Sequence, residues 1–244
     1  MKSELFLGDC LDKMKNIPDG SADLCLTDPP YGTTQCKWDS IIPFEPMWEQ
    51  LKRIVKPNSA ICLFGSEPFS SHLRLSNIKM FKYDWIWCKS KATGHLNSKK
   101  RPLVKHEIVS VFCDGQSHYF PQGLVEKNKP TVSKGNRGKK GEGSGGDVYG
   151  YASKDSIQTH TNYPLSIQKF NVDMKALFHP TQKPVPLLEY LIKTYTLEGE
   201  TVLDFTMGSG STGVAAKNLN RNFIGIEKDK EYFEIAKKRI EASN

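Results

Sequence analysis

One stretch near the end of the chain constrains its fold more than any other part. Residues 202–227 run through a short apolar strand, a turn with three glycines in six residues, a helix and a second strand that ends in Glu227. Glycines let the backbone turn tightly against a bound ligand, and the following helix offers its N-terminus to negative charge. Glu227 follows Gly208 by 19 residues, a position where a carboxylate can accept both hydroxyls of a ribose. The pattern predicts a nucleoside cofactor at the ends of two neighbouring parallel strands.

Two kinds of cofactor fit this stretch. Its spacing matches the fingerprint of a dinucleotide-binding site. It fits S-adenosylmethionine equally, with Asp204 beside the amino acid end of that molecule. The stretch alone leaves both open.

The remainder of the chain predicts one large α/β domain with an insertion. At 244 residues, the chain can bury a core that needs no disulfide or metal staples. Apolar runs predict strands at 3–7, 22–27, 59–64, 83–88, 107–113, 200–205 and 222–226, and helices at 45–55, 68–76, 184–195, 213–218 and 230–242. Strands that alternate with helices favour a mostly parallel sheet covered on both faces. Between residues 115 and 178 the apolar periodicity fades, which predicts a flexible insertion.

Charge and cysteine content narrow the class of protein. The net charge is +7, and residues 127–140 hold six basic residues and no acidic one, namely Lys127, Lys129, Lys134, Arg137, Lys139 and Lys140. Such a segment predicts contacts with the phosphates of nucleic acid. The six cysteines form no Cys-x-x-Cys pair, so we expect free thiols in a reducing compartment and no metal site. The chain shows neither a signal peptide at its start nor an apolar run of about 20 residues, which predicts a cytoplasmic protein that does not cross a membrane.

A second motif lies near the start of the chain, where Asp28-Pro29-Pro30-Tyr31 follows the strand predicted at 22–27. An acid at the carboxyl end of a parallel strand points into the crevice where such sheets bind ligands. The two prolines stiffen the turn, so the Asp28 carboxylate and the Pro29 carbonyl are two rigid acceptors that face one spot. Two acceptors suit an amino group with two N–H donors, and Tyr31 can stack on a flat ring. The motif predicts a pocket for an extruded base with an exocyclic amine.

Together the two motifs resemble those of the amino-group DNA methyltransferases. DPPY at Asp28–Tyr31 precedes DFTMGSGSTG at Asp204–Gly213. This permuted order resembles the β-class adenine-N6 enzymes of restriction–modification systems and phages. HPTQKP at His179–Pro184 is similar to the family's lead-in to its cofactor half. DPPY in place of SPPY favours adenine over cytosine. The resemblance covers most of the chain except its basic middle.

The resemblance implies a Rossmann-like, circularly permuted fold with a mostly parallel sheet of seven strands, the first strand lying beside the two C-terminal ones. Residues 1–114 would form the catalytic half, 115–178 a flexible basic insertion that recognises the target, and 179–244 the cofactor-binding half. A flipped adenine of double-stranded DNA would meet the catalytic residues Asp28, Pro29, Pro30 and Tyr31. S-adenosylmethionine would contact Asp9, Cys10, Thr181, Lys183, Asp204, Phe205, Gly208, Gly210 and Glu227. Lys37 would join the six basic residues of 127–140 in binding DNA.

Particular roles follow from the same resemblance. Asp9 would accept the amino group of the cofactor's adenine, and Glu227 would hold its ribose. Thr181 and Lys183 would bind its carboxylate, and Asp204 would lie by its methionine part.

Three alternatives stay open at this point. Methylation of cytosine at N4 needs nearly the same base chemistry. An oxidoreductase that uses a dinucleotide explains residues 208–227 and gives no role to DPPY. A DNA-binding protein without catalysis explains the charge and leaves both predicted pockets without a role. The resemblance also leaves room for a second copy of the chain and a cognate restriction endonuclease as partners.

Overall fold

The chain forms two compact units in a computed structural model, which describes residues 2–33, 39–133, 155–171 and 182–243. The larger unit comprises Met1–Phe120 and Ser166–Asn244, and the smaller one comprises Pro121–Leu165. Within the described residues, every helix is too short or too polar to cross a membrane.

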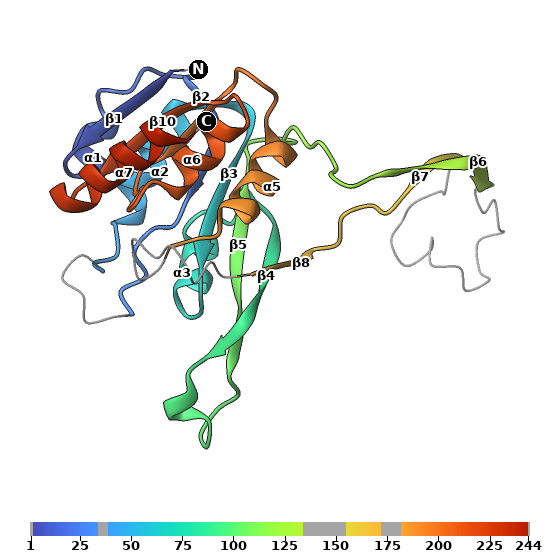
Figure 1. Cartoon of the computed structure of the whole chain (residues 1–244), viewed down its shortest axis with the longest axis horizontal. Coiled ribbons are helices and arrows are strands. Elements are labelled where there is room, and N and C mark those ends of the chain that lie inside the picture. The colour runs from blue at the N-terminus through green and yellow to red at the C-terminus, as the bar shows by residue number, and fades with distance from the viewer. Residues whose placement is uncertain (1, 34–38, 134–154, 172–181, 244) are drawn as a thin grey trace. The chain divides into compact units, whose positions relative to one another are not determined.

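An eight-stranded sheet forms the centre of the larger unit (Figure 1). Its order is β1 (Ser3–Leu7), β10 (Asn222–Glu227), β9 (Thr201–Asp204), β2 (Ala22–Thr27), β3 (Val55–Gly65), β5 (Val104–Phe112), β4 (Phe81–Thr93) and β8 (Ile167–Phe170). Of these described strands, β5 alone runs against the rest. The mostly parallel sheet and the place of the first strand beside the last one are confirmed. The eighth strand, β8, was not expected, because its segment shows no apolar alternation.

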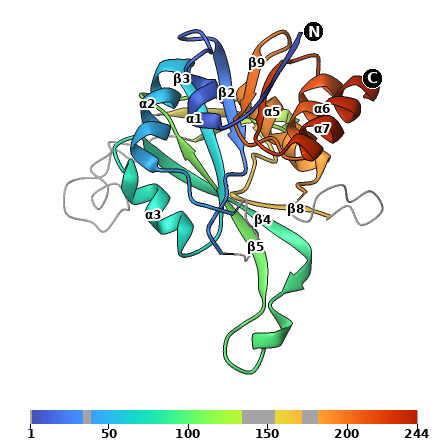
Figure 2. The ribbon, with the colours of Figure 1, turned by 90° about the vertical axis from the view of Figure 1, so that its left-hand side faces the viewer.

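Helices cover both faces of the sheet, as Figure 2 shows. One core holds α5 (Val185–Tyr195), α6 (Ser211–Asn218) and α7 (Lys230–Ala242) against side chains such as Leu24 and Leu26. The other holds α1 (Cys10–Met14), α2 (Phe44–Ile54) and α3 (Phe69–Ser76) against side chains such as Cys25. Successive residues of β2 therefore serve opposite cores, because side chains alternate across a strand. This explains why the middle of β2, at Leu24, Cys25 and Leu26, is continuously apolar.

The chain order of the strands reverses between β2 and β9, and this reversal positions the site. From β2 the chain moves outward to β3, and from β9 it moves the other way to β10. The two strands lie side by side, with Leu24 opposite Val202 and Cys25 opposite Leu203. Sheets of this kind bind ligands outside the carboxyl ends of the strands at such a point. The motifs after Thr27 and Leu203, far apart in sequence, meet there.

A long hairpin extends from the other half of the sheet (Figure 1). It consists of the outer parts of β4 and β5, joined through the short 3-10 helix η1 (His95–Asn97). The sequence predicted only residues 83–88 and 107–113 of these strands. The outer residues are polar and exposed, so they lack the apolar signal that marks a buried strand.

The smaller unit is a two-stranded antiparallel ribbon of β6 (Val125–Ser133) and β7 (Ser156–Thr161). Residues 127–133 lie within the segment expected to be a flexible insertion, and they form part of β6. Lys127 and Lys129 lie on this strand, and Lys129 is exposed. The backbone N–H and C=O groups of a ribbon form hydrogen bonds between its two strands, and neither face of the ribbon is buried. Hydrophobic periodicity therefore does not reveal it. The functional division at 1–114, 115–178 and 179–244 stays a prediction.

Tyr195 provides a test of the core. Its side chain is 1% exposed, and its hydroxyl lies 2.7 Å from Trp85 Nε1 and 2.9 Å from the Tyr83 hydroxyl. We expect Tyr195→Phe to lower the free energy of unfolding by about 1–3 kcal/mol, because the buried Trp85 N–H loses its acceptor. Urea denaturation measures this. Tyr119→Phe, which removes a more exposed hydroxyl, is the control; equal losses in both variants would contradict the assignment.

Candidate active site

Asp28 stands at the carboxyl end of β2, where the DPPY turn begins. Its Oδ1 accepts a hydrogen bond from the Tyr31 hydroxyl, and its backbone carbonyl accepts one from Thr206 Oγ1 at 3.1 Å. The Tyr31 ring stacks on Phe69 with centroids 5.1 Å apart. Pro29 is buried and Pro30 half-buried. The turn is therefore braced from both sides, while 23% of the Asp28 side chain stays exposed.

A chain of alternating charges leads away from Asp28. Lys183 Nζ donates to Asp28 Oδ2 and lies 3.3 Å from Glu107 Oε2. Lys89 pairs with Glu107 on the opposite side. Two cations and two anions thus neutralise one another beside the DPPY turn. Lys183, 8% exposed in its side chain, was expected at the carboxylate of a cofactor, and among the described residues it contacts these two acids.

This pairing sets the protonation of the group. Burial alone would lower the pKa of Lys183, but the Asp28 and Glu107 carboxylates raise it above its usual value. Burial would raise the pKa of Glu107, and the adjacent Lys183 and Lys89 lower it instead. Burial raises the pKa of Asp28, and the Lys183 ammonium opposes that rise. The Asp28 carboxylate is thus a hydrogen-bond acceptor held next to a cation, and its pKa stays above the usual value for an aspartate.

Asp204 lies beside this turn, at the end of β9, with 3% of its surface exposed. Thr27 Oγ1 donates to its Oδ1, and the Thr206 backbone N–H lies 3.1 Å from the same oxygen. The Thr27 and Thr206 hydroxyls are also 2.9 Å apart. Because Thr206 bonds to both Asp204 and Asp28, it joins the two predicted motifs. Neither threonine is recognisable in the sequence as part of a site, because threonine alone does not mark one.

Burial raises the pKa of Asp204 from 3.8 to about 6, opposed by hydrogen bonds from Thr27, Thr212 and the Thr206 backbone. Because the pKa of Asp204 is higher in the folded than in the unfolded protein, ionising this carboxyl lowers the free energy of unfolding. The loss is complete at a pH above the folded pKa, and it shrinks as the pH falls from the folded pKa toward the unfolded pKa. We therefore expect the stability of Asp204→Asn relative to the wild type to be greater at pH 8 than at pH 5, by about 1 kcal/mol. Urea denaturation at the two pH values measures it. A difference that does not change with pH would contradict the assignment.

Glu227 ends β10 next to the glycine turn. Its Oε2 accepts from the Gly208 backbone N–H at 2.8 Å, and its Oε1 accepts from the Asp229 N–H at 2.8 Å. Burial raises the pKa of Glu227, and these backbone donors oppose the rise. Each carboxylate oxygen has two lone pairs, so both can accept one further donor. The carboxylate is therefore preorganised to hold a diol.

Other residues predicted near the cofactor take distinct places. Asp9 caps α1 by accepting from the Leu11 N–H at 3.0 Å, and it pairs with Lys228 at 3.2 Å. Cys10 is 8% exposed in one core, where burial raises the pKa of its thiol to about 12. Phe205 is 1% exposed in the same core. Asp9 thus lies near Glu227, to whose carbonyl the neighbouring Gly8 donates at 2.8 Å, whereas the Cys10 and Phe205 side chains serve packing.

Gly208 and Gly210 have φ values of 52° and 80°, in the left-handed region that favours glycine. A Cβ on Gly210 would also lie 2.8 Å from the Ala236 Cβ of α7. Packing of the turn against α7 therefore explains Gly210 without a ligand. Gly208 is the glycine whose N–H points to Glu227.

Several predicted residues lie outside the described part of the chain. These are Lys37, Lys134, Arg137, Lys139, Lys140 and Thr181. Next to Thr181, Gln182 accepts from Ser209 Oγ at 3.3 Å, which connects the segment before α5 with the glycine turn.

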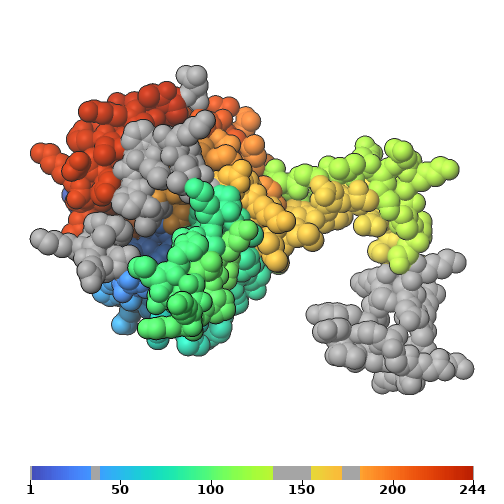
Figure 3. Space-filling view, turned by 60° about the horizontal axis from the view of Figure 1, so that its bottom comes forward, coloured from blue at the N-terminus to red at the C-terminus, as the bar shows by residue number. Residues whose placement is uncertain are grey.

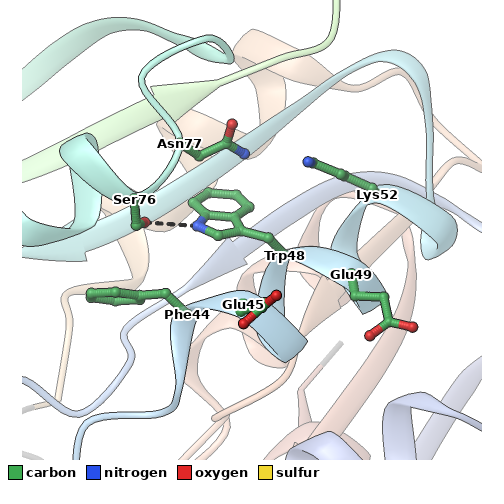
Figure 4. A pocket seen from close by; sticks show the side chains of 7 residues that line it. All are labelled: Phe44, Glu45, Trp48, Glu49, Lys52, Ser76 and Asn77. Carbon is green, nitrogen blue, oxygen red and sulfur yellow. Dashed lines mark hydrogen bonds between the residues drawn. The ribbon is translucent and has the colours of Figure 1, made fainter.

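A surface hollow of about 680 Å³ lies elsewhere, between α2 and the end of α3 (Figure 4). Trp48 forms its floor and donates to Ser76 Oγ at 2.8 Å. Its rim carries Glu45, Glu49 and Lys52. None of the residues predicted to bind cofactor or base lines it, so the hollow is separate from the site. In the described residues no three His, Cys, Asp or Glu side chains cluster as metal ligands would.

Comparisons with known proteins agree with this geometry. A family model described as "DNA methylase" (N6_N4_Mtase) matches residues 22–238. Type II methyltransferase M2.DpnII of Streptococcus pneumoniae is 31% identical, over 96% of this chain and 87% of that relative. Type II methyltransferase M.HpaI of Haemophilus parainfluenzae is 28% identical, over 99% of this chain and 75% of that relative.

Solved structures share the fold. The M1.HpyAVI–SAM complex has a TM-score of 0.65 at 27% identity and covers 97% of this chain and 99% of that one. The PvuII DNA methyltransferase, described as cytosine-N4-specific, has a TM-score of 0.67 at 15% identity and covers 98% of this chain and 86% of that one. Because the PvuII enzyme is described as cytosine-specific, similarity of fold does not distinguish adenine from cytosine as the target base.

Proposed function

The chain belongs to the DNA methylase family, and we propose that it transfers a methyl group from S-adenosylmethionine to the exocyclic N6 amine of a flipped adenine in duplex DNA. The observation that carries the proposal is the junction of two motifs. Asp28 and Asp204 end neighbouring strands, and Thr206 bonds to both at 3.1 Å. One hydrogen-bond network thus connects the residue that would accept the base with the residues that would hold the cofactor. Transfer of a group directly from one substrate to another needs such a fixed arrangement.

The residues at Asp28 act on the amine. The lone pair of an adenine amine is delocalised into the ring, so the amine is a poor nucleophile. When the Asp28 carboxylate and the Pro29 carbonyl accept its two N–H groups, they favour a pyramidal nitrogen and direct the lone pair. Asp28 orients the amine and does not need to remove a proton before the methyl group is transferred. The proton becomes acidic only after the methyl group has been added, and it leaves to water.

The residues present fit the cofactor. Both oxygens of Glu227 keep a lone pair for a ribose hydroxyl after they accept the Gly208 and Asp229 N–H groups. When bound, S-adenosylmethionine supplies a methyl group on a sulfonium, which is a good leaving group. Residues 202–227 alone also allowed a dinucleotide, and the match to a DNA methylase and to a methyltransferase solved with SAM favours S-adenosylmethionine. Asp9, Asp204 and Gly208 are proposed as further cofactor contacts, and Lys183 as the residue that links the cofactor side to Asp28.

The proposed function also implies partners and a place in the cell. The DNA substrate is double-stranded, and the enzyme works in the cytoplasm, where bacterial or phage DNA is found. The ribbon residues Lys127 and Lys129 and the basic residues that follow them contact phosphates. A second copy of the chain and a cognate restriction endonuclease are further proposed partners, on the strength of the Type II relatives.

Nucleoside mass spectrometry tests the reaction. Unmethylated DNA is incubated with the protein and S-adenosylmethionine and then digested to nucleosides. N6-methyladenine is the expected product. N4-methylcytosine would keep the fold and the mechanism and overturn the choice of base. No methylated base on several diverse DNAs, although the protein binds S-adenosylmethionine, would overturn the proposed substrate.

A further inference from the structure

The outer part of the β4–β5 hairpin, residues 89–106, is a basic arm. It carries Lys89, Lys91, Lys99, Lys100, Arg101 and Lys105 and contains no acidic residue. Apart from Lys89, these side chains are exposed, and none pairs with a carboxylate among residues that the structure describes. Figure 3, turned so that the arm comes forward, shows it as green atoms on the surface of the molecule. The arm is not evident in the sequence, because its charges are spread over two strands and a turn.

The tip of the arm is ordered by its own backbone. Asn97 N–H donates to the Gly94 carbonyl at 2.9 Å, and Lys100 and Arg101 donate to the Asn97 carbonyl at 2.8 and 3.0 Å. Gly94 has a φ of 88°, which favours glycine. On this tip Leu96 is fully exposed, at 101%. A rigid turn therefore presents one bare apolar side chain, followed by three consecutive cations at 99–101.

The arm begins at the active site. Its first residue, Lys89, pairs with Glu107, which is linked through Lys183 to Asp28. From Lys89 to Thr93 the strand extends about 13 Å before the tip begins. A duplex whose target base reaches Asp28 must lie within reach of an arm anchored there. The major groove is about 8.5 Å deep, so the arm is long enough to reach into it.

We propose that this arm grips duplex DNA beside the flipped base, with Leu96 inserted as a wedge into the base stack and Lys99, Lys100 and Arg101 on the flanking phosphates. The inference rests on the proposed function and adds to it the element that opens the duplex. Apolar side chains between base steps are an established means of unstacking DNA, and flipping a base leaves a gap that such a side chain can fill.

Charge distinguishes DNA from a second copy of this chain as the occupant. Two arms brought together would face each other with like charges and no acid between them, which is unfavourable. DNA, by contrast, is a polyanion, and its phosphates attract the exposed cations of the arm.

The wedge is tested with Leu96→Ala, after methylation sites of the wild-type enzyme have been mapped on phage DNA. On a matched duplex with such a site, we expect the methylation rate of the variant to be at least roughly tenfold lower than that of the wild type. The reason is that no side chain then fills the gap that the flipped base leaves in the stack. On the same duplex with the target base mismatched, the two enzymes should differ by less than about twofold, because a mismatched base costs less to extrude. Leu75→Ala, which shortens a leucine 72% exposed on α3, is the matched control.

The phosphate contacts are tested by DNA binding, independently of methylation. We expect Lys99→Ala combined with Lys100→Ala to reduce the slope of log K against log salt by about 2, at about 0.9 per lost contact. Lys237→Ala with Lys238→Ala removes two exposed cations from α7 and should leave the slope unchanged.

Different failures have different meanings. A wild-type enzyme that methylates no DNA overturns the proposed function. A wild-type enzyme that methylates, with an unchanged Leu96→Ala variant or with equal losses on matched and mismatched duplexes, overturns the wedge alone. Arm variants that change the sedimentation mass of the free protein and not its DNA binding would make the arm a self-association element and overturn its assignment to DNA.

Discussion

Replacing Asp28 with alanine stops methylation and leaves the cofactor bound. We expect kcat to fall by about 10²- to 10³-fold, the range for removal of one preorganised hydrogen-bonding group at a reacting centre. The physical reason is that the target amine loses the acceptor that draws its lone pair out of the ring. The cofactor side stays intact, because Glu227 and the glycine turn are held by backbone bonds that Asp28 does not share. Transfer of radiolabelled methyl groups measures kcat, and calorimetry measures the Kd for S-adenosylmethionine.

Two features make this test decisive. Lys183 keeps Glu107 as a partner in the variant, so no unpaired cation is left in the site. Asp28→Asn is the matched control: it keeps the shape and one carbonyl oxygen and should retain more activity than Asp28→Ala. Loss of cofactor binding in step with turnover would show that Asp28 supports the fold of the site and not the reaction.

Replacing Glu227 with alanine has the opposite kinetic signature. We expect the affinity for S-adenosylmethionine to fall by about 10²- to 10⁴-fold, because two hydrogen bonds to a charged group contribute about 1.5–3 kcal/mol each. The apparent KM for the cofactor rises accordingly, and most of kcat returns when the cofactor is saturating. Initial rates over a range of cofactor concentrations separate the two constants.

Glu227→Gln is the milder comparison, since its amide oxygen still accepts one of the two backbone N–H groups. It should fall between the wild type and Glu227→Ala in affinity. A variant that stays inactive at saturating cofactor would mean that Glu227 has a part in the chemistry, or that the turn around Gly208 collapses without it. Far-UV circular dichroism distinguishes these, because a collapse of the turn would also change the adjoining α6.

Much of the fold could be read from the sequence because buried parallel strands and amphipathic helices leave strong patterns. The helix at 230–242 and the strands at 3–7 and 22–27 have the predicted bounds. The family predicted from DPPY and the glycine turn is confirmed by the match over residues 22–238. The strand and helix patterns each depend on residues close together in the chain. The family was recognised from two such local motifs and from their order in the chain.

What the sequence could not reveal depends on register and on distant pairing. Glu107 is one acid among 27, and its place at the site depends on the register of β5, where it lies opposite Trp87 of β4. Lys183 lies 155 residues from Asp28 in the chain, and its contact with that carboxylate arises from the arrangement of α5 beside β2. The strands β6, β7 and β8 bury little apolar surface, so no periodicity marks them.

The pairing of β1 with β10 has a consequence for how the protein is made. Leu7 lies opposite Glu227 in that pair, so β1 leaves the ribosome well before its partner strand and must wait for it. At translation rates of 5–20 residues per second, that wait is roughly 10–40 s. During that wait the edge of β1 that later pairs with β10 is open, and a chaperone or another nascent chain could pair with it. The cofactor cradle needs Glu227 at the end of β10, so a chain halted before that residue can build the base-binding turn but cannot load its methyl donor.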